Sequence, residues 1–428
     1  MIALDLSRLL SRAGRGTPTG IDRVELAYAE HLIARGADAC FAALSASGRL
    51  GLLQHRVAER FVAAIGATWR GEPDPARHER RVRRTARQAK IALLAGGERA
   101  LTLRLRTGGA PPVYLLVSHH HLEKRSLIAR LKERSAARFI CLVHDLIPIE
   151  FPEYAKPGQA EHHLRRIETA AQFADALIVN SAVTAKALQP HLDRALRAPP
   201  VLVAPFGADL PAAPKLGAPP IERPYFVYVS TIEARKNHLL LLNLWRQLAG
   251  ELGESAPKLV LVGQRGWETE NVVDMLDRCP ALRGLVIEHN AMPDGEMVHL
   301  VKGARALLLP SFAEGFGFPL IEALELGVPA LCSDIAALRE TGGTVPEFLD
   351  PLDGPGWRSA ILDYAAPGSP RREAQLARLT HWDPPRWEQH FAIVDRFIAE
   401  VAASPAGAGL AGAGLAGAGL AGAPLAAE

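Results

Sequence analysis

The chain has little of what marks several classes of protein. Only four cysteines occur among its 428 residues, and they stand apart, without the CxxC pairs typical of structural metal sites. We therefore expect buried thiols in a reducing compartment rather than a framework of disulfides. The sequence contains no run of eighteen apolar residues, the length needed to cross a bilayer. Its first residues also lack the basic start and the apolar core of a signal peptide. These absences predict a cytoplasmic protein.

Two common nucleotide-binding fingerprints are also missing. No GxGxxG follows a predicted strand, and no GxxxxGK occurs, which removes the main support for a dehydrogenase or a kinase. The net charge is only +3, so the chain as a whole does not indicate a polyanionic partner such as nucleic acid. With 48% hydrophobic and 22% charged residues, the composition is that of a globular protein long enough for two domains.

The most informative stretch is PSFAEGFGFPLIEALELGVPALCS, residues 310–333. An apolar run precedes it and predicts a buried strand, which breaks into a loop at Ser311. Pro319 suits the first position of a helix, and Gly327 stands where a left-handed residue would end that helix. A second apolar run follows. This order of strand, loop, helix and strand predicts a parallel sheet, with the loop at the carboxyl edge where ligands bind.

Two glutamates, Glu314 in the loop and Glu322 in the helix, flank this expected site. A carboxylate accepts paired hydrogen bonds from vicinal hydroxyl groups, so one glutamate suits a sugar and the other a ribose. Gly315 and Gly317 would let backbone amides approach a phosphate or a ring closely. In the alternative interpretation, Glu322 is a solvated helix residue and the glycines only turn the chain.

Three further groups stand where predicted strands of the chain end. Gly20 lies in the loop TPTGIDRV after the first strand, and a glycine-containing loop there can receive a phosphate. In the alternative interpretation, Thr19 or Asp22 caps a helix that starts in this loop. His144 follows the apolar run FICLV and could donate a hydrogen bond to a sugar hydroxyl, or simply pack at the strand end. The run of three histidines at 119–121 does not predict a metal site, because neighbouring residues of a strand face opposite ways.

Arg235 and Lys236 follow a strand predicted to begin at residue 225. Two cations there would neutralise a diphosphate leaving group, although they could also be solvated residues at a helix start. Residues 210–224 are rich in proline, alanine and glycine and predict a linker. We therefore expect an amino-terminal domain at 1–209, a second domain at 225–380, a final amphipathic helix at 381–403 and a disordered low-complexity tail at 404–428.

Residues 80–106 are rich in arginine and contain one acidic residue, Glu98. Leucine and alanine are interleaved with the arginines, a pattern that suits the surface of an anionic membrane. A solvated arginine-rich helix is the alternative interpretation. A nucleic-acid surface is disfavoured because the segment has no aromatic residue for base stacking.

The string E-GFGFPLI-E and its surroundings resemble the retaining glycosyltransferases of family 4, in particular those of bacterial polysaccharide and lipopolysaccharide assembly. The resemblance covers residues 1–403 and is strongest over 225–351. It implies an α/β protein of the GT-B fold, with two Rossmann-like domains facing across a cleft and a last helix that crosses back to the first domain. The chain departs from the family's pattern at two places. The loop TPTGIDRV stands where a Gly-Gly pair is usual, and Ser230 stands where many members have arginine.

The resemblance implies roles for single residues. Arg235 and Lys236 would hold the diphosphate, Glu322 the ribose and Glu314 the donor sugar, and His144 would lie beside that sugar. The implied set of donor-binding or catalytic residues is Glu314, His144, Arg235, Lys236, Glu322, Gly315, Phe316, Gly317 and Gly20, with residues 289–292 gripping the base. We expect Glu314→Ala to abolish transfer and to leave the fold intact.

The resemblance also implies a reaction that requires no metal or other cofactor. The string STIEARKNH is similar to those of bacterial mannosyltransferases, which favours GDP-mannose over a UDP-sugar as donor. The acceptor would be a saccharide, lipid-linked, and the protein could touch the inner face of the cytoplasmic membrane. Two alternatives remain open: another GT-B reaction, such as phosphorolysis or epimerisation, and a scaffold that binds a sugar nucleotide without transferring the sugar.

Overall fold

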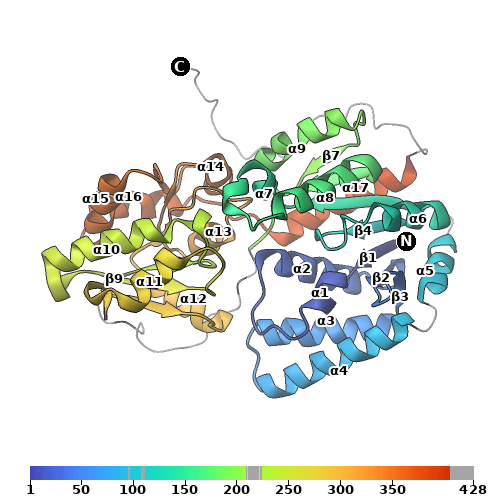
Figure 1. Cartoon of the computed structure of the whole chain (residues 1–428), viewed down its shortest axis with the longest axis horizontal. Coiled ribbons are helices and arrows are strands. Elements are labelled where there is room, and N and C mark those ends of the chain that lie inside the picture. Colours follow the sequence, from blue (N-terminus) through green and yellow to red (C-terminus); the bar gives the residue numbers. More distant parts are fainter. Residues whose placement is uncertain (95–96, 108–110, 209, 211–220, 222–223, 405–428) are drawn as a thin grey trace. The chain divides into compact units, whose positions relative to one another are not determined.

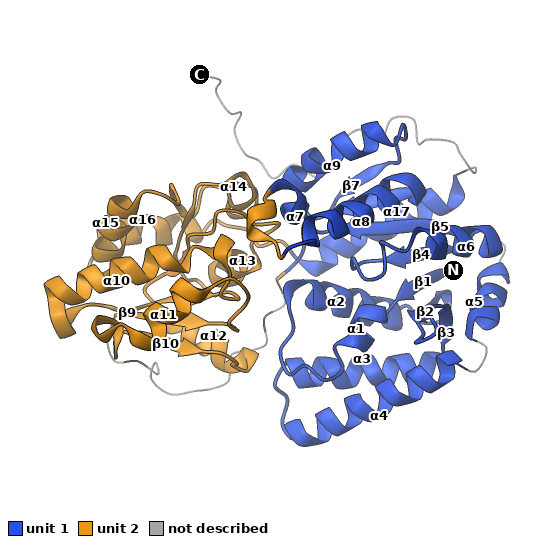
Figure 2. Ribbon diagram, in the orientation of Figure 1, with its two compact units in different colours: residues 1–150, 157–207, 386–428 blue, residues 151–156, 208–385 orange. Residues whose placement is uncertain are grey.

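A computed structural model describes residues 1–94, 97–107, 111–208, 210, 221 and 224–404 of the chain. It divides into two compact units (Figure 2). Unit 1 comprises Met1–Glu150, Pro157–Gly207 and the chain from Arg386 onward, and unit 2 comprises Phe151–Lys156 and Ala208–Pro385. Most of the expected linker at 210–224 and nearly all of the expected tail lie outside the described residues.

Unit 1 is built on a seven-stranded sheet with the order β3-β2-β1-β4-β5-β6-β7 (Figure 1). Its strands are near-continuous apolar runs, as expected where helices cover both faces of a parallel sheet. Only the pairing of β2 with β3 is antiparallel. The strands are β1 (Ile2–Asp5), β2 (Ala39–Leu44), β3 (Leu50–Leu53), β4 (Val113–Leu116), β5 (Arg138–Val143), β6 (Ala176–Val179) and β7 (Val201–Val203).

The helices of unit 1 include two long ones, α3 and α4, that follow β3 and lie along one another (Figure 1). The basic segment forms α4 and α5 rather than one helix. The helices are α1 (Ser7–Ser11), α2 (Gly20–Ala34), α3 (His55–Trp69), α4 (Pro75–Leu94), α5 (Gly97–Arg106), α6 (Arg125–Ser135), α7 (Ile147–Glu150), α8 (Gln159–Phe173), α9 (Ala182–Arg194) and α17 (Trp387–Ala403).

Unit 2 is a six-stranded, wholly parallel sheet with the order β10-β9-β8-β11-β12-β13. Its strands are β8 (Tyr225–Val229), β9 (Lys258–Val262), β10 (Val286–His289), β11 (Leu307–Leu309), β12 (Ala330–Ser333) and β13 (Glu347–Leu349). Its helices are α10 (His238–Leu252), α11 (Glu270–Arg278), α12 (Asp294–Gly303), α13 (Phe318–Glu325), α14 (Ala336–Gly342), α15 (Gly354–Ala365) and α16 (Pro370–Leu379). Both units are therefore Rossmann-like, as the sequence predicts.

Two boundaries differ from those predicted. The segment Phe151–Lys156 belongs to unit 2, because Tyr154 stacks on Phe312 with ring centroids 5.7 Å apart and Lys156 lies over the Trp267 ring. The final helix begins at Trp387 instead of residue 381. Two consecutive prolines, at 384 and 385, explain this later start, since proline lacks an N–H and keeps the residue before it extended.

Helix α17 returns to unit 1, as predicted for the last helix of a GT-B protein. It buries one apolar stripe, as expected of an amphipathic helix, and the stripe includes Phe391, Val394, Phe397 and Ile398. His390 is also buried, a position that the sequence did not single out. Its Nδ1 lies 3.0 Å from the carbonyl oxygen of Pro205 and its Nε2 lies 2.8 Å from the hydroxyl of Tyr28. The neutral ring therefore donates to Pro205 and accepts from Tyr28.

The docking of α17 should weaken in acid. Burial lowers the pKa of His390 from its usual value near 6.5 to about 4. Between these two values the unfolded chain binds a proton that the folded chain does not, so stability falls as pH falls through this window. Between these pKa values, we expect His390→Gln to reduce the slope of the unfolding free energy against pH by up to ~1.4 kcal/mol per pH unit. This is the slope that corresponds to the uptake of one proton on unfolding. Urea titrations at a series of pH values measure this slope.

The matched control for this prediction is Tyr28→Phe, which removes the hydrogen bond to His390 and keeps the histidine. It should lower stability by about 1 kcal/mol while leaving the slope close to that of the parent chain. Equal slopes for His390→Gln and the parent chain would show that another group governs acid unfolding.

Two simpler expectations concern cysteines and membrane-spanning segments. All four cysteines are free, and three of them are buried, whereas Cys279 is only half-buried. Within the described ranges, no helix has the length and apolar character needed to cross a bilayer.

Candidate functional site

The strand order of unit 2 reverses between β8 and β11. Strands after β8 first add on one side, as β9 and β10, and then on the other side, as β11 to β13. The loops that leave the carboxyl ends of two such strands diverge, and the crevice between them is the usual ligand site of an open parallel sheet. Here these are the loop after β8, with Arg235 and Lys236, and the loop after β11, with Glu314. The predicted site residues of the two loops therefore meet at the switch point.

The loop after β11 follows the prediction closely. β11 and β12 pair in parallel, with Leu307 opposite Ala330, and α13 connects them. Gly327, just past the helix, has a φ of +76°, as expected of a left-handed cap. The helix begins at Phe318, however, so Pro319 is its second residue and not its first. Either position suits proline, because neither N–H has a partner within the helix.

Gly317 has a specific reason to be glycine. Its φ is +86°, and a Cβ at this position would lie 2.6 Å from Cδ2 of Leu338. The residue ends the loop as the N-cap of α13, and its carbonyl oxygen accepts a hydrogen bond from the backbone N–H of Leu320 at 2.9 Å. Phe316 beside it is buried, with its ring 5.3 Å from that of Phe318 in an edge-to-face contact. Gly315 is half-buried between Phe316 and Glu314 in the chain.

Glu314 and the two cations make direct contact. The Glu314 carboxylate accepts hydrogen bonds from Lys236 Nζ at 2.5 Å, from Ser311 Oγ at 2.7 Å and from Arg235 Nη1 at 3.3 Å. Arg235 also donates to the carbonyl oxygen of Ala313 at 2.8 Å. The Glu314 and Lys236 side chains are only 7% and 8% exposed, and that of Arg235 is 22% exposed. The pair is thus nearly buried, with one partly accessible cation beside it.

The charges of this cluster keep its carboxylate ionised. Burial alone would raise the pKa of Glu314, but the positive charges of Lys236 and Arg235 and the bonds from Lys236 and Ser311 lower it to about 2. Burial, with Arg235 next to it, lowers the pKa of Lys236, although Glu314 opposes this change. A second carboxylate belongs to this cluster: Glu233 Oε2 lies 3.4 Å from Arg235 Nε, so two carboxylates face the two cations. A phosphate bound here would compete with these carboxylates for the cations.

Tyr228 and Ser311 hold the two loops together, and neither of them was predicted as a site residue from the sequence. The Tyr228 hydroxyl, at the fourth residue of β8, donates to the carbonyl oxygen of Lys236 at 2.7 Å and lies 3.3 Å from Ser311 Oγ. The backbone N–H of Phe312 donates to the carbonyl oxygen of Arg235 at 2.8 Å. A buried tyrosine in a strand was the available signal, because its hydroxyl must find a polar partner.

Glu322 and the proposed base-binding residues lie on neighbouring elements of unit 2. Glu322 is half-buried one turn into α13. Residues 289–292 follow β10, the strand at the edge of the sheet beyond β9. All of these positions are at or after carboxyl ends of strands. Ser230 stands where many members of family 4 have arginine, and its Oγ lies 3.4 Å from Nε2 of His238.

His144 and Gly20 belong to unit 1, so they are described separately. His144 is buried just past the end of β5, and its Nε2 lies 2.8 Å from the carbonyl oxygen of Val117. A carbonyl oxygen can only accept a hydrogen bond, so Nε2 carries the proton and donates a hydrogen bond to Val117 O. In the neutral ring this leaves Nδ1 as a hydrogen-bond acceptor. Burial lowers the pKa of His144 to about 4. The prediction that this ring donates to a sugar hydroxyl therefore needs correction: near neutral pH the ring has only an acceptor to offer.

Gly20 is the first residue of α2, and both capping residues named from the sequence are present. The side chain of Asp22 accepts a hydrogen bond from the Thr19 backbone N–H at 2.8 Å. Arg8 donates to the same carboxylate at 2.6 Å, and Asp22 is buried. Gly20 is thus placed at a capped helix start, the arrangement that the sequence offered as the alternative to phosphate binding.

Unit 1 contains a buried acidic network that was not predicted from the sequence. Asp5, at the end of β1, accepts hydrogen bonds from Ser7 N at 2.8 Å and His121 Nε2 at 3.0 Å, and also from the Tyr114 hydroxyl. Burial, reinforced by the Asp5 charge, raises the pKa of Glu25 on α2 to about 8. A charged residue at the end of MIALD was the available signal. No group of three or more metal-ligating side chains gathers anywhere in the described part of the chain.

Comparisons with known proteins agree with this geometry. Residues 214–343, which include both switch-point loops, match the family described as glycosyl transferases group 1. The O-antigen chain mannosyltransferase B of Escherichia coli is 34% identical over 164 residues, which cover 38% of this chain and 42% of that protein. The serotype-specific mannosyltransferase WbdA of Escherichia coli is 31% identical over 224 residues, covering 48% of this chain and 27% of that protein. The aligned region thus spans less than half the length of either relative.

Solved structures support the fold of the whole chain. A sucrose-phosphate synthase from Thermosynechococcus elongatus covers 94% of this chain and 98% of its own, with a TM-score of 0.59 at 18% identity. An α,α-trehalose 6-phosphate synthase from Burkholderia multivorans matches over 94% of this chain and 99% of its own chain, with a TM-score of 0.60 at 13% identity. At such identities the likeness concerns the fold alone, and it confirms the predicted GT-B class.

Proposed function

We propose that this chain, whose residues 214–343 match the family described as glycosyl transferases group 1, is a retaining hexosyltransferase that uses a nucleotide-sugar donor and needs no metal. The observation that carries the proposal is the cluster of Arg235, Lys236 and Glu314 at the switch point of unit 2. Two cations from one loop lie there beside the carboxylates of Glu314 and Glu233, at the carboxyl ends of two neighbouring strands. Cations in this position can pair with the oxygens of a diphosphate.

The ion pair suggests how donor binding changes the site. In the structure, Glu314 pairs with both Lys236 and Arg235, and Glu233 pairs with Arg235 as well. A bound diphosphate would take over these cations, because it brings more negative charge than one carboxylate. The oxygens of Glu314 would then be available to accept hydrogen bonds from hydroxyls of the donor sugar. Glu322, on the helix that follows, would bind the ribose, as the resemblance to family 4 implies.

The proposed chemistry is a front-face displacement. The bond between the sugar's anomeric carbon and the diphosphate oxygen breaks, and a bond to the acceptor oxygen forms on the same face. The proton of the acceptor hydroxyl passes to the departing phosphate, so no protein base is needed. Lys236 and Arg235 would stabilise the charge that develops on the leaving group. His144, neutral at Nδ1, would accept a hydrogen bond from a sugar hydroxyl.

The substrates are proposed from the relatives. Both relatives described above are named as mannosyltransferases, and one is named for the O-antigen chain, which favours GDP-mannose as donor. The acceptor would then be a growing saccharide of a surface polysaccharide, carried on a lipid. The reaction would lengthen that saccharide by one mannose.

Thermal unfolding with GDP, UDP, ADP and their hexose derivatives tests the donor. A ligand that binds only the folded chain stabilises it by about 2.7 kcal/mol at a hundredfold excess over its dissociation constant. We expect GDP and GDP-mannose to raise the melting temperature and ADP to leave it unchanged. Release of GDP from GDP-mannose with a mannan oligosaccharide then tests transfer. A shift with UDP alone would overturn the choice of donor, and no shift with any nucleotide would contradict the proposed activity.

A further inference from the structure

Helices α4 and α5 carry an unusual concentration of positive charge. Together they contain ten arginine and lysine residues and two glutamates, whereas the whole chain has a net charge of +3. The rest of the chain is therefore net acidic. One glutamate, Glu79, pairs with Arg83 one turn later, and the other, Glu98, pairs with Arg134 of α6 at 2.8 Å. Most of the arginines on these helices thus face solvent without an acidic neighbour on their own element.

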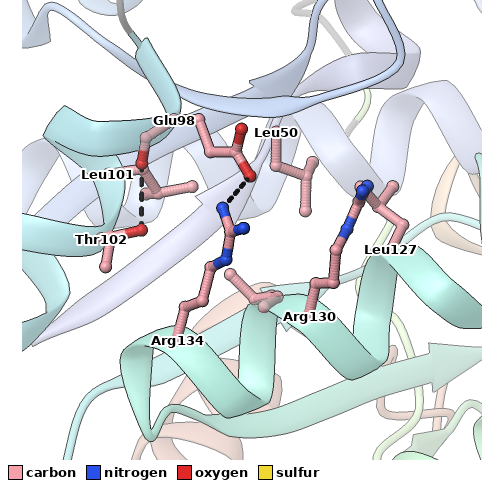
Figure 3. Close-up of a pocket in the computed structure, with 8 residues that line it drawn as sticks. Leu50, Glu98, Leu101, Thr102, Leu127, Arg130 and Arg134 are labelled. Atoms are coloured by element: carbon pink, nitrogen blue, oxygen red, sulfur yellow. Dashed lines mark hydrogen bonds and ion pairs between the residues drawn. The ribbon is translucent and has the colours of Figure 1, made fainter.

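The inner faces of both helices are ordinary core. Val82, Ala86, Ala89 and Leu93 bury one stripe of α4, which packs along α3. Leu101 and Leu105 bury one stripe of α5. Helix α5 packs against α6 around a small hollow that Leu101, Leu127 and Leu131 help to line. Figure 3 shows Leu101 and Leu127 there, together with the Glu98–Arg134 ion pair that joins the two helices. Neither helix needs its outer face for packing within unit 1.

The outer faces mix large apolar side chains with the arginines. Ile91 is 58% exposed, Leu94 62% and Leu103 66%. These are three of the seven large apolar side chains that stand exposed in the described part of the chain, and they fall within residues 91–103. An isolated exposed leucine needs no explanation, but a group of them on two contacting helices does.

Charge and apolar side chains share the same stripe of α4. Positions three or four apart lie on one side of a helix, and the exposed positions in this series are Arg80, Arg84, Arg87, Ile91 and Leu94. On α5 the corresponding series is Arg99, Leu103 and Arg106. We call these eight side chains the basic apolar surface. Arginine followed by leucine or isoleucine along one face is the pattern of a helix that lies on an anionic bilayer.

We propose that the basic apolar surface binds an anionic lipid bilayer, with Ile91, Leu94 and Leu103 inserted among the acyl chains and the arginines at the headgroups. A nucleic acid would be matched by the arginines alone, and the surface has no aromatic residue for stacking. An acidic protein would likewise leave three large apolar side chains to be covered by a matching patch. An anionic bilayer matches both the arginines and the apolar side chains, since its headgroups carry phosphate and its interior is apolar. This proposal does not depend on the proposed transfer activity.

Flotation of the whole protein with vesicles tests the proposal. One vesicle is phosphatidylcholine alone, and the other contains phosphatidylglycerol in addition. We expect binding to the anionic vesicles, weakened by salt, and at least about tenfold weaker binding to the neutral ones. The triple variant Ile91→Ser, Leu94→Ser, Leu103→Ser should lose at least about tenfold in affinity for the anionic vesicles, because insertion of these side chains contributes to binding.

The matched control replaces three exposed leucines elsewhere, Leu196→Ser, Leu252→Ser and Leu352→Ser, and should bind as the parent does. A second variant, Arg80→Gln, Arg84→Gln, Arg87→Gln, should also weaken binding to the anionic vesicles. Melting temperatures of all variants should stay close to that of the parent, since none of these side chains is buried.

If the Ile91, Leu94 and Leu103 variant binds vesicles as well as the parent, or if duplex DNA competes fully for the surface, the contact is polyanion binding and the proposal is wrong. If light scattering shows a dimer that this variant disrupts, the surface is covered by a second copy and the proposal is also wrong.

Discussion

Replacing Glu314 by glutamine should reduce sugar transfer by at least about a hundredfold, the size of effect seen when one preorganised polar group is removed from an active site. Glutamine keeps the shape of the side chain but loses the negative charge that faces Lys236 and Arg235. It also turns an amide group toward one of these cations and toward the sugar hydroxyls. Steady-state kinetics with GDP-mannose, comparing kcat and KM, measures the loss.

The pairing of Glu314 dictates the choice of glutamine. From the sequence, Glu314→Ala is expected to leave the fold intact, but Lys236 is buried against this carboxylate, so alanine would leave the cation with neither the charge nor a hydrogen-bond acceptor there. Glutamine also removes the charge, but its amide oxygen can still accept a hydrogen bond from Lys236. The matched control is Glu373→Gln on α16, an exposed glutamate far along the chain, which should retain full activity. Transfer within about threefold of the parent enzyme for Glu314→Gln would remove Glu314 from the proposed mechanism, given a melting temperature that shows an intact fold.

Local sequence patterns were sufficient to predict where most residues of the candidate site of unit 2 lie in the fold. The apolar runs on either side of the loop identify β11 and β12, and Gly327 marks the end of α13. They also place Glu314 and Lys236 at carboxyl ends of strands, where ligands bind. The direct contact between these two residues could not be predicted in the same way. They are 78 residues apart, and they meet because β8 and β11 are neighbours in the sheet, a fact of topology and not of local pattern.

The electrostatic state of a residue was harder to predict than its place. His144 was correctly put at the end of β5, yet its hydrogen-bonding role depends on the carbonyl oxygen of Val117, 27 residues earlier in the chain. The same holds for His390, whose partners are Tyr28 and Pro205. Buried histidines take their tautomer from neighbours that a single sequence does not identify. Asp5 was overlooked for a related reason, since its partners come from β4 and the segment that follows it.

A double-mutant cycle on Lys236 and Glu314 should show strong coupling in stability. Glu314→Leu leaves both cations without the carboxylate and should cost about 3–5 kcal/mol of unfolding free energy, as for other broken buried pairs. Lys236→Met should cost less, because Arg235 and Ser311 still bond to Glu314. The double variant removes the opposing charges together, and we expect it to be more stable than the sum of the single losses by about 1–3 kcal/mol. Urea unfolding near pH 7 measures all four proteins.

The pH dependence of this cycle identifies the carboxylate as its source. The folded pKa of Glu314, about 2, lies below the ordinary glutamate value of 4.5. Its contribution is therefore complete above pH 4.5 and is lost as the pH falls toward 2. The coupling energy should shrink over the same interval, as far as the folded state persists. Additive single losses at pH 7 would mean that the two side chains do not stabilise one another. In that case the cations of the loop after β8 would be available to a diphosphate without any exchange of partners, and donor binding would not release Glu314.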